Sequence, residues 1–406
     1  MSKEKRRVPK LRFPGFTEDW EQRKLSDILV ERNEQQVETN EYPLMSFVQG
    51  HGVIPKGERY DRSFLVLDQS KKYKRTELGD FIYSSNNLET GSIGINKTGK
   101  AVISPVYSIF YGVSIGDSQF IGIMSLLPRF IAKMIRFRQG VVYGQWRIHE
   151  KDFLDISILI PSEAERTKIT KLILSIEELI TLHQRKLNNL KLKKKALLQK
   201  LFPKNGERYP ELRFPGFTDA WEQRKLIYIF NDFIVPMRDK PKVFSGTTPW
   251  TRIEDIEGRY INTSLSGQFV SDETIKSMNL KVIPKGSLIV SASATFGVVA
   301  IVNNDLITNQ TFIGLVPNKD FDIDFLYSLF EAPTTKGKLL KLSAGSTIFY
   351  IARESFENLV LSVPSKEEQI KISKVFKSID DSITLHQRKL DHLQLQKKAL
   401  LQQMFI

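Results

Sequence analysis

Residues 175–202 read SIEELITLHQRKLNNLKLKKKALLQKLF, and residues 378–405 read SIDDSITLHQRKLDHLQLQKKALLQQMF. The two stretches are identical at 19 of 28 positions. In both, apolar residues recur at alternating steps of four and three, which is typical of a helix that packs along its length against another helix. A coincidental amphipathic pattern is a weak explanation, because the same register occurs twice. The pattern predicts two long helices, at residues 161–203 and 364–406.

A second repeat lies at the start of each half of the chain. Residues 10–25 read KLRFPGFTEDWEQRKL and residues 211–226 read ELRFPGFTDAWEQRKL, identical at 13 of 16 positions. The offsets of the two repeats, 201 and 203, are each about half of the 406 residues. The chain is therefore expected to be two tandem copies of one unit.

The middles of the two copies, residues 27–150 and 228–353, share little beyond a common order of elements. Two divergent middles on duplicated frames suggest one architecture with two different recognition surfaces, and drift after duplication is the alternative. In the first copy we expect strands at 80–85, 100–104 and 106–111, then a helix at 117–139 and a strand at 156–160. In the second copy we expect strands at 287–293, 298–303 and 311–316, then a helix at 322–342 and a strand at 359–363.

The expected fold class is α+β, with two tandem mixed α/β domains that are each followed by a long helix. The expected boundaries are 1–160 for the first domain, 161–203 for the first helix, 204–363 for the second domain and 364–406 for the second helix. Chain continuity favours an antiparallel coiled coil with internal pseudo-twofold symmetry, in which the domains lie at opposite ends of helices about 60 Å long.

Two pairs of polar residues fall on the predicted helix seam, His183 with His386 and Lys194 with Lys397. Buried polar residues fix register in coiled coils, and we expect these pairs to do the same. A metal site is not expected there, because five His and no clustered carboxylates leave too few ligands.

The composition limits the class of protein. The chain has no Cys, which excludes disulfides, Cys-based zinc sites, iron–sulfur clusters and a thiol nucleophile. No apolar run approaches the length of a membrane span, so the protein is expected to be soluble and cytoplasmic. The net charge of +14 favours a polyanion, nucleic acid before membrane, as partner. The alternative is a basic protein whose charge serves solubility alone.

No constellation of residues that would mark an enzyme is evident. The sequence lacks GxGxxG, GxxxxGK(S/T) and HExxH. It also lacks the Asn-Pro-Pro-aromatic tetrad of amino-methylating enzymes. We therefore expect no catalytic residues, although scattered carboxylates forming a nuclease site remain an alternative.

The duplicated LRFPGFT…WEQRKL segments and the (I/V)PS…SI…ITLHQRKL…KKALLQ helices make the chain resemble the specificity subunit of a Type I restriction–modification system. The resemblance spans essentially the full chain. It implies a non-catalytic subunit whose two target-recognition domains each read one half of a split, asymmetric DNA target, with the helix pair setting the gap. It also implies two methylation subunits and two motor-nuclease subunits as partners. S-adenosylmethionine, ATP and magnesium are expected in those partners, and no cofactor in this chain.

In the family, the loop before the last strand of each variable domain meets DNA. The matching positions are Gly144–Arg147 in the first copy and residues 345–347, followed by Tyr350 and Arg353, in the second. Arg, Gln and Asn read base edges, and Lys positions the backbone. The candidate DNA-binding residues are Lys71, Lys72, Tyr73, Lys74, Arg75, Arg136, Arg138, Tyr143, Gln145, Trp146, Arg147, Lys240, Lys242, Arg252, Lys336, Lys338, Lys341, Ser346, Thr347, Tyr350 and Arg353.

The aromatic residues of the repeated N-terminal segments are a further candidate site. They pack the frame of each unit, and their retention in both copies also suits docking of two copies of one partner. The candidate partner-binding residues are Phe13, Phe16, Trp20, Phe214, Phe217 and Trp221. The runner-up function is a stand-alone pseudo-dimeric DNA-binding regulator or scaffold without methyltransferase partners.

Overall fold

The computed structural model describes residues 6–48, 52–55, 70–88, 92–114, 116–142, 145–236, 239–291, 297–342 and 353–406, with the backbone alone at 87, 140–142 and 145. The chain divides into two compact units, one formed by Met1–Thr181 with Asp391–Ile406 and the other by Leu182–Leu390. Both boundaries fall inside the long helices. Each unit therefore contains one variable domain and a piece of each long helix.

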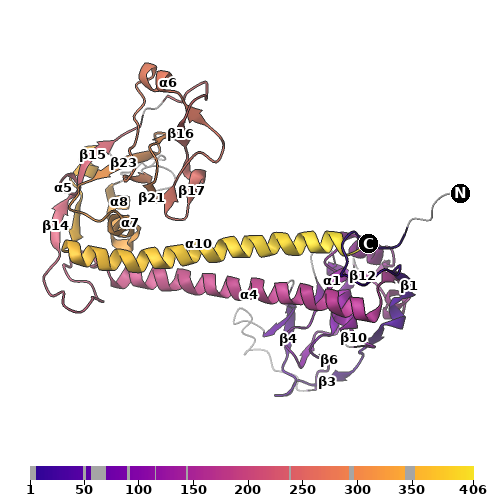
Figure 1. The fold of residues 1–406 in the computed structure, drawn as a ribbon. Coiled ribbons are helices and arrows are strands. Elements are labelled where there is room, and N and C mark those ends of the chain that lie inside the picture. Colours follow the sequence, from indigo (N-terminus) through magenta and orange to yellow (C-terminus); the bar gives the residue numbers. More distant parts are fainter. Residues whose placement is uncertain are drawn as a thin grey trace. The chain divides into compact units, whose positions relative to one another are not determined.

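The two long helices are α4 (Glu163–Lys200) and α10 (Lys366–Gln403), against predicted spans of 161–203 and 364–406. They run alongside each other within each unit (Figure 1). In the second unit, His183 Nδ1 lies 2.8 Å from His386 Nδ1, and Lys194 Nζ lies 2.6 Å from Asp380 Oδ1. Rising residue numbers on α4 thus meet falling numbers on α10, and the predicted antiparallel pairing is confirmed.

The first unit builds its variable domain from short antiparallel strands. The first sheet has the strand order β2 (Leu29–Glu31), β10 (Ser108–Gly112), β7 (Phe81–Tyr83) and β8 (Ile93–Ile95). A second sheet has the order β3 (Gln35–Gln36), β6 (Tyr73–Thr76) and β9 (Ala101–Ile103). Two hairpins add the pairs β4 (Met45–Val48) with β5 (Gly52–Pro55) and β11 (Gln139–Val142) with β12 (Gln145–Arg147). Helix α1 (Asp117–Met124) packs on the first sheet. It approaches closely, because a Cβ on Gly122 would lie 2.1 Å from Cγ1 of Ile95.

The second unit has a larger mixed sheet. Its strand order is β15 (Phe230–Ile234), β23 (Phe312–Pro317), β20 (Leu288–Ser291), β21 (Val299–Val302), β18 (Tyr260–Ile261) and β17 (Ile256–Glu257). A separate three-stranded sheet has the order β19 (Phe269–Val270), β16 (Thr248–Thr251) and β22 (Ile307–Thr308). Helix α7 (Ile323–Glu331) packs on β21, and the short helices α5 (Leu226–Ile229) and α6 (Asp272–Ser277) join strands. Ser271 caps α6 by accepting a hydrogen bond from the Thr274 N–H at 3.2 Å.

The predicted helices at 117–139 and 322–342 are each broken in two. The first is α1 followed by α2 (Pro128–Ile135), and the second is α7 followed by α8 (Pro333–Leu342). In both cases the second helix starts at a proline. Proline fits the first turn of a helix but cannot continue an earlier one, because its ring removes the backbone N–H donor.

Each unit has the same frame at its base. Strand β1 (Glu21–Lys24) pairs with β13 (Ser157–Ile160), and β14 (Glu222–Lys225) pairs with β24 (Val360–Val363), both antiparallel and in the same register. The short helices α3 (Glu150–Leu154) and α9 (Arg353–Glu357) precede the second strand of each pair. The first strand of each pair lies in the repeated segments 10–25 and 211–226, whereas its partner strand lies outside the repeated sequence.

Trp20 and Trp221 are 2% and 1% exposed, so their prediction as partner-binding residues is corrected. Trp20 packs in the first unit against Phe405, which follows α10. Trp221 packs in the second against Phe202, which follows α4. Each tryptophan therefore completes a core around the helix end that the other copy supplies.

The other four predicted aromatics are half-buried. Phe13 and Phe214 pack against the two cores. Phe16 lies under Lys168 and Phe217 under Lys371, with Nζ to ring-centroid distances of 5.0 and 4.7 Å. All four retain some exposed surface, so their role in partner binding stays a prediction.

A buried ion pair ties each frame to its helix. Arg12 donates two hydrogen bonds to the Glu165 carboxylate, at 2.8 and 2.6 Å. Arg213 donates two to Glu368, at 2.9 and 2.8 Å. The carboxylates are only 1% exposed as side chains, and bidentate pairing compensates the loss of their hydration.

Candidate nucleic-acid interface

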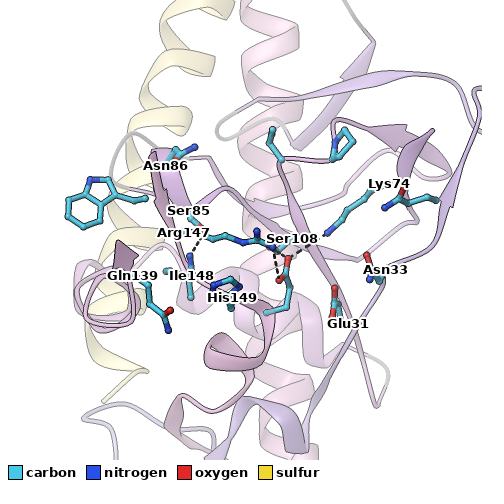
Figure 2. A pocket seen from close by; sticks show the side chains of 15 residues that line it. Glu31, Asn33, Lys74, Ser85, Asn86, Ser108, Gln139, Arg147, Ile148 and His149 are labelled. Carbon is cyan, nitrogen blue, oxygen red and sulfur yellow. Dashed lines mark hydrogen bonds and ion pairs between the residues drawn. The ribbon is translucent and has the colours of Figure 1, made fainter. Parts of the chain in front are cut away.

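A groove of about 930 Å³ opens in the first variable domain, where β2, β6 and β10 meet the hairpin β11–β12 and the start of α3. Its walls come from segments far apart in the sequence. The lining is mixed in charge and rich in amides and hydroxyls: Glu31, Asn33, Gln35, Lys74, Ser85, Asn86, Pro105, Val106, Ser108, Gln139, Trp146, Arg147, Ile148, His149 and Glu150. Figure 2 shows Glu31, Asn33 and Lys74 on one side of the groove, with Gln139 and Asn86 on the other.

Glu150 organises this groove. Its Oε1 accepts a hydrogen bond from Ser108 Oγ at 2.8 Å and lies 3.6 Å from Lys74 Nζ. Its Oε2 lies 3.9 Å from Arg147 Nη2 (Figure 2). Burial alone would raise the pKa of the Glu150 carboxyl, but these hydrogen bonds and cations hold that pKa below its ordinary value. Glu150 is thus a carboxylate that positions two of the predicted DNA-binding cations.

The hairpin β11–β12 presents an aromatic and a guanidinium at the groove. Trp146 is 44% exposed, and the Arg138 guanidinium lies 5.9 Å from the centroid of its ring. Arg147, the next residue, has a side chain that is 65% exposed. An exposed indole beside guanidinium groups suits stacking and hydrogen bonding with nucleic-acid bases.

The remaining predicted residues of the first domain divide into three groups. Lys71, Lys72 and Arg136 are exposed, and Lys71 and Tyr73 line a separate hollow of about 280 Å³. Arg75 bonds to Glu34 at 2.8 Å and to Glu77, so its charge is paired within the fold, and its contact with DNA stays a prediction. Tyr143 lies outside the described residues, as does the side chain of Gln145.

The predicted residues of the second domain are more scattered. Lys240, Lys242, Lys336 and Lys341 are exposed. Arg252 donates to Gln268 at 2.7 Å, and Lys338 donates to the Val360 carbonyl at 2.9 Å, so these two serve the fold, and burial lowers the pKa of Lys338.

The loop before the last strand of this domain is described only at its end. Arg353 begins α9, is exposed and donates to Glu357 at 2.6 Å. Ser346, Thr347 and Tyr350 lie outside the described residues. The described part of the second domain therefore offers separate exposed lysines and Arg353.

Sequence reasoning missed most of the polar lining of the first groove. Asn33 follows β2, Gln35 begins β3, Asn86 follows β7 and Gln139 begins β11. The search for basic residues passed over them because amides carry no charge. A search for amides and hydroxyls just beyond strand ends would have included several of them.

Two further properties concern the described residues only. No helix among them has the length and apolar character to cross a membrane. No three His, Asp or Glu side chains among them converge in a group that could hold a metal ion.

Residues 221–395 match the family model described as Type I restriction modification DNA specificity domain. This segment, in the second half of the chain, is therefore similar to the DNA specificity domain of the Type I restriction family, and the relatives below are specificity subunits of that family. Among relatives of this family, the MjaIX specificity subunit of Methanocaldococcus jannaschii is 32% identical over 34% of this chain and 33% of its own length. The chain thus matches about a third of that relative.

Other comparisons extend over almost the whole chain. The putative MjaX specificity subunit of the same organism is 22% identical over 95% of this chain and 92% of the relative. The crystal structure of the Type I restriction–modification S subunit from M. genitalium covers 98% of this chain and 99% of that chain at 14% identity and a TM-score of 0.61. At this identity the structural match shows the α+β fold with its tandem domains and long helices.

Proposed function

We propose that this chain is a Type I restriction specificity subunit that reads a bipartite, asymmetric DNA target, with one half of the target bound by each variable domain. The observation that carries the proposal is the groove of the first domain, where Trp146 and Arg147 stand beside amides able to bond to base edges. The duplicated frames supply the second reader, and its different surface implies a different half-sequence.

The proposal includes a spacer role for the helices. Helix α4 has 38 residues, which corresponds to about 57 Å at 1.5 Å per residue. Half-site readers bind one or more duplex turns apart, at about 34 Å per turn. A helix of this length suits such a separation, and the ion pair of Lys194 with Asp380 and that of Lys397 with Glu177 fix its register.

The subunit is further proposed to be the non-catalytic scaffold of a larger complex. Two methylation subunits would dock on the frames, where Phe16 and Phe217 retain exposed surface, and two motor-nuclease subunits would join them. S-adenosylmethionine, ATP and magnesium would be bound by those partners.

An exchange of the first variable domain tests the proposal. The chain, purified with its methylation partner, is expected to protect two short DNA segments separated by an unprotected gap. Replacing residues 27–150 with the corresponding segment of another specificity subunit should change one protected half and leave the other intact. A continuous, unsplit footprint would contradict bipartite reading, and DNA protection by a chain that never associates with large partners would favour a stand-alone regulator.

A further inference from the structure

Glu31, the last residue of β2, is the carboxylate of the groove whose partners are unaccounted for. Its side chain is half-buried and lines the groove beside Asn33 (Figure 2). None of the described residues donates a hydrogen bond to it. Burial raises the pKa of Glu31, nearby Glu150 adds to that effect, and Lys74 opposes it. The Glu31 carboxylate can therefore accept a hydrogen bond from a ligand that enters the groove.

Glu150, in the same groove, is by contrast a carboxylate with partners inside the protein. It accepts from Ser108 and lies near both Lys74 and Arg147. Lys74 is 7% exposed, so its charge is directed to the interior of the groove rather than to solvent. The cations here are therefore oriented by Glu150, and Glu31 remains the acceptor available to a ligand.

The chemistry of DNA limits what Glu31 can accept. Phosphate oxygens repel a carboxylate, and guanine O6 and N7 and thymine O4 are themselves acceptors. The donors in the major groove are the exocyclic amino groups of cytosine and adenine. We propose that Glu31 is the hydrogen-bond acceptor with which the first domain selects an amino-bearing base, adenine or cytosine, in its half of the target. This inference rests on the proposed function.

The second unit supplies a natural comparison. Asp232 is the third residue of β15, as Glu31 is of β2, although a register shift after Phe230 changes its pairing with the neighbouring strand β23. Its Oδ1 accepts a hydrogen bond from the Phe233 N–H at 2.7 Å, and the residue is exposed. Asp232 is thus satisfied by its own backbone, and its truncation is a matched control.

The test uses the full chain with its methylation partner. The target is first selected from a random duplex library. Each adenine or cytosine in the half that the first domain reads is then replaced by purine or 2-pyrimidinone, analogues without the amino group. At one position the wild-type complex should lose about 10-fold or more in affinity, the value of one good base contact. The base at the position where affinity falls shows whether Glu31 binds adenine or cytosine.

Two variants assign this penalty to Glu31. E31A should bind the analogue and the natural base within about 2-fold of each other, while E31Q, whose amide also donates, should relax the preference toward thymine or guanine at that position. D232A should behave as the wild type in both halves. A split target with no amino-dependent position, or an unchanged penalty in E31A, overturns this inference and leaves the proposed function standing. Failure to select any split target overturns both.

Discussion

Trp20 packs edge-on against Phe405 in the first unit, with ring centroids 6.2 Å apart and ring planes at 85°. The second unit repeats the contact between Trp221 and Phe202, at 5.9 Å and 84°. Backbone bonds accompany both: the Leu11 N–H donates to the Gln403 carbonyl at 2.9 Å, and the Leu212 N–H donates to the Lys200 carbonyl at 2.8 Å. The helix end of each copy is therefore built into the core of the other copy's unit.

Removing one of these rings should destabilise one unit selectively. F405A is expected to cost about 3–5 kcal/mol in the first unit, because it leaves a cavity beside Trp20 and Phe120. F202A should have the corresponding effect on the second unit. Hydrogen exchange resolved by peptide measures the two effects separately. L395A on α10, where the side chain is 67% exposed, is the control, and equal loss of protection in both units for F405A would contradict the assignment.

The buried ion pair of Arg12 with Glu165 should be far more sensitive than a surface pair. R12A leaves Glu165 buried without its partner, which is expected to cost about 3–5 kcal/mol in unfolding free energy. R6A breaks a pair with Asp19 whose side chains are 66% and 45% exposed, and should cost less than about 1 kcal/mol. Denaturant unfolding compares the two, and similar losses would show that the Glu165 carboxylate finds other partners or water.

The histidine pair makes the stability of the second unit depend on pH. The pKa of His183 is lowered by burial and by the nearby charges of His386, Lys389 and Lys186. The unfolded chain then binds protons more readily than the folded one, so the contribution is fully present above the ordinary histidine pKa of about 6.5 and is lost as pH falls below it. Unfolding measured from pH 8 to 5 should show this loss, and the loss should shrink in the double variant H183Q/H386Q.

Glu150 should limit binding to random DNA. E150Q removes the negative charge next to Lys74 and Arg147, which frees both for phosphates. The affinity for a random-sequence duplex should rise several-fold, and the slope of log affinity against log salt should steepen by about 1 for each phosphate gained. E41Q, which breaks an exposed pair with Lys100 outside the groove, is the control. An unchanged salt slope in E150Q would argue that both cations remain directed inward.

Regular patterns were predictable from the sequence, and sites assembled from distant segments were not. The seam of α4 and α10 follows from heptad spacing, and Ile169, Ile173 and Leu187 on it are at most 1% exposed. The breaks at Pro128 and Pro333 were missed because apolar periodicity continues through them. Glu31, Asn86 and Gln139 line one groove only because the folded sheet brings them close together. No local sequence pattern predicts that these distant residues lie near each other.

The place of Phe405 in the first unit has a consequence for biosynthesis. Domains generally fold in the order in which they leave the ribosome, at about 5–20 residues per second. The first unit must wait for on the order of 200 further residues, roughly 10–40 s at that rate, before the ring that covers Trp20 exists. Phe202, the partner of Trp221, is by contrast synthesised before Trp221. The half of the protein translated first is therefore the half whose core is completed last, and until then its unfinished surface is exposed in the nascent chain.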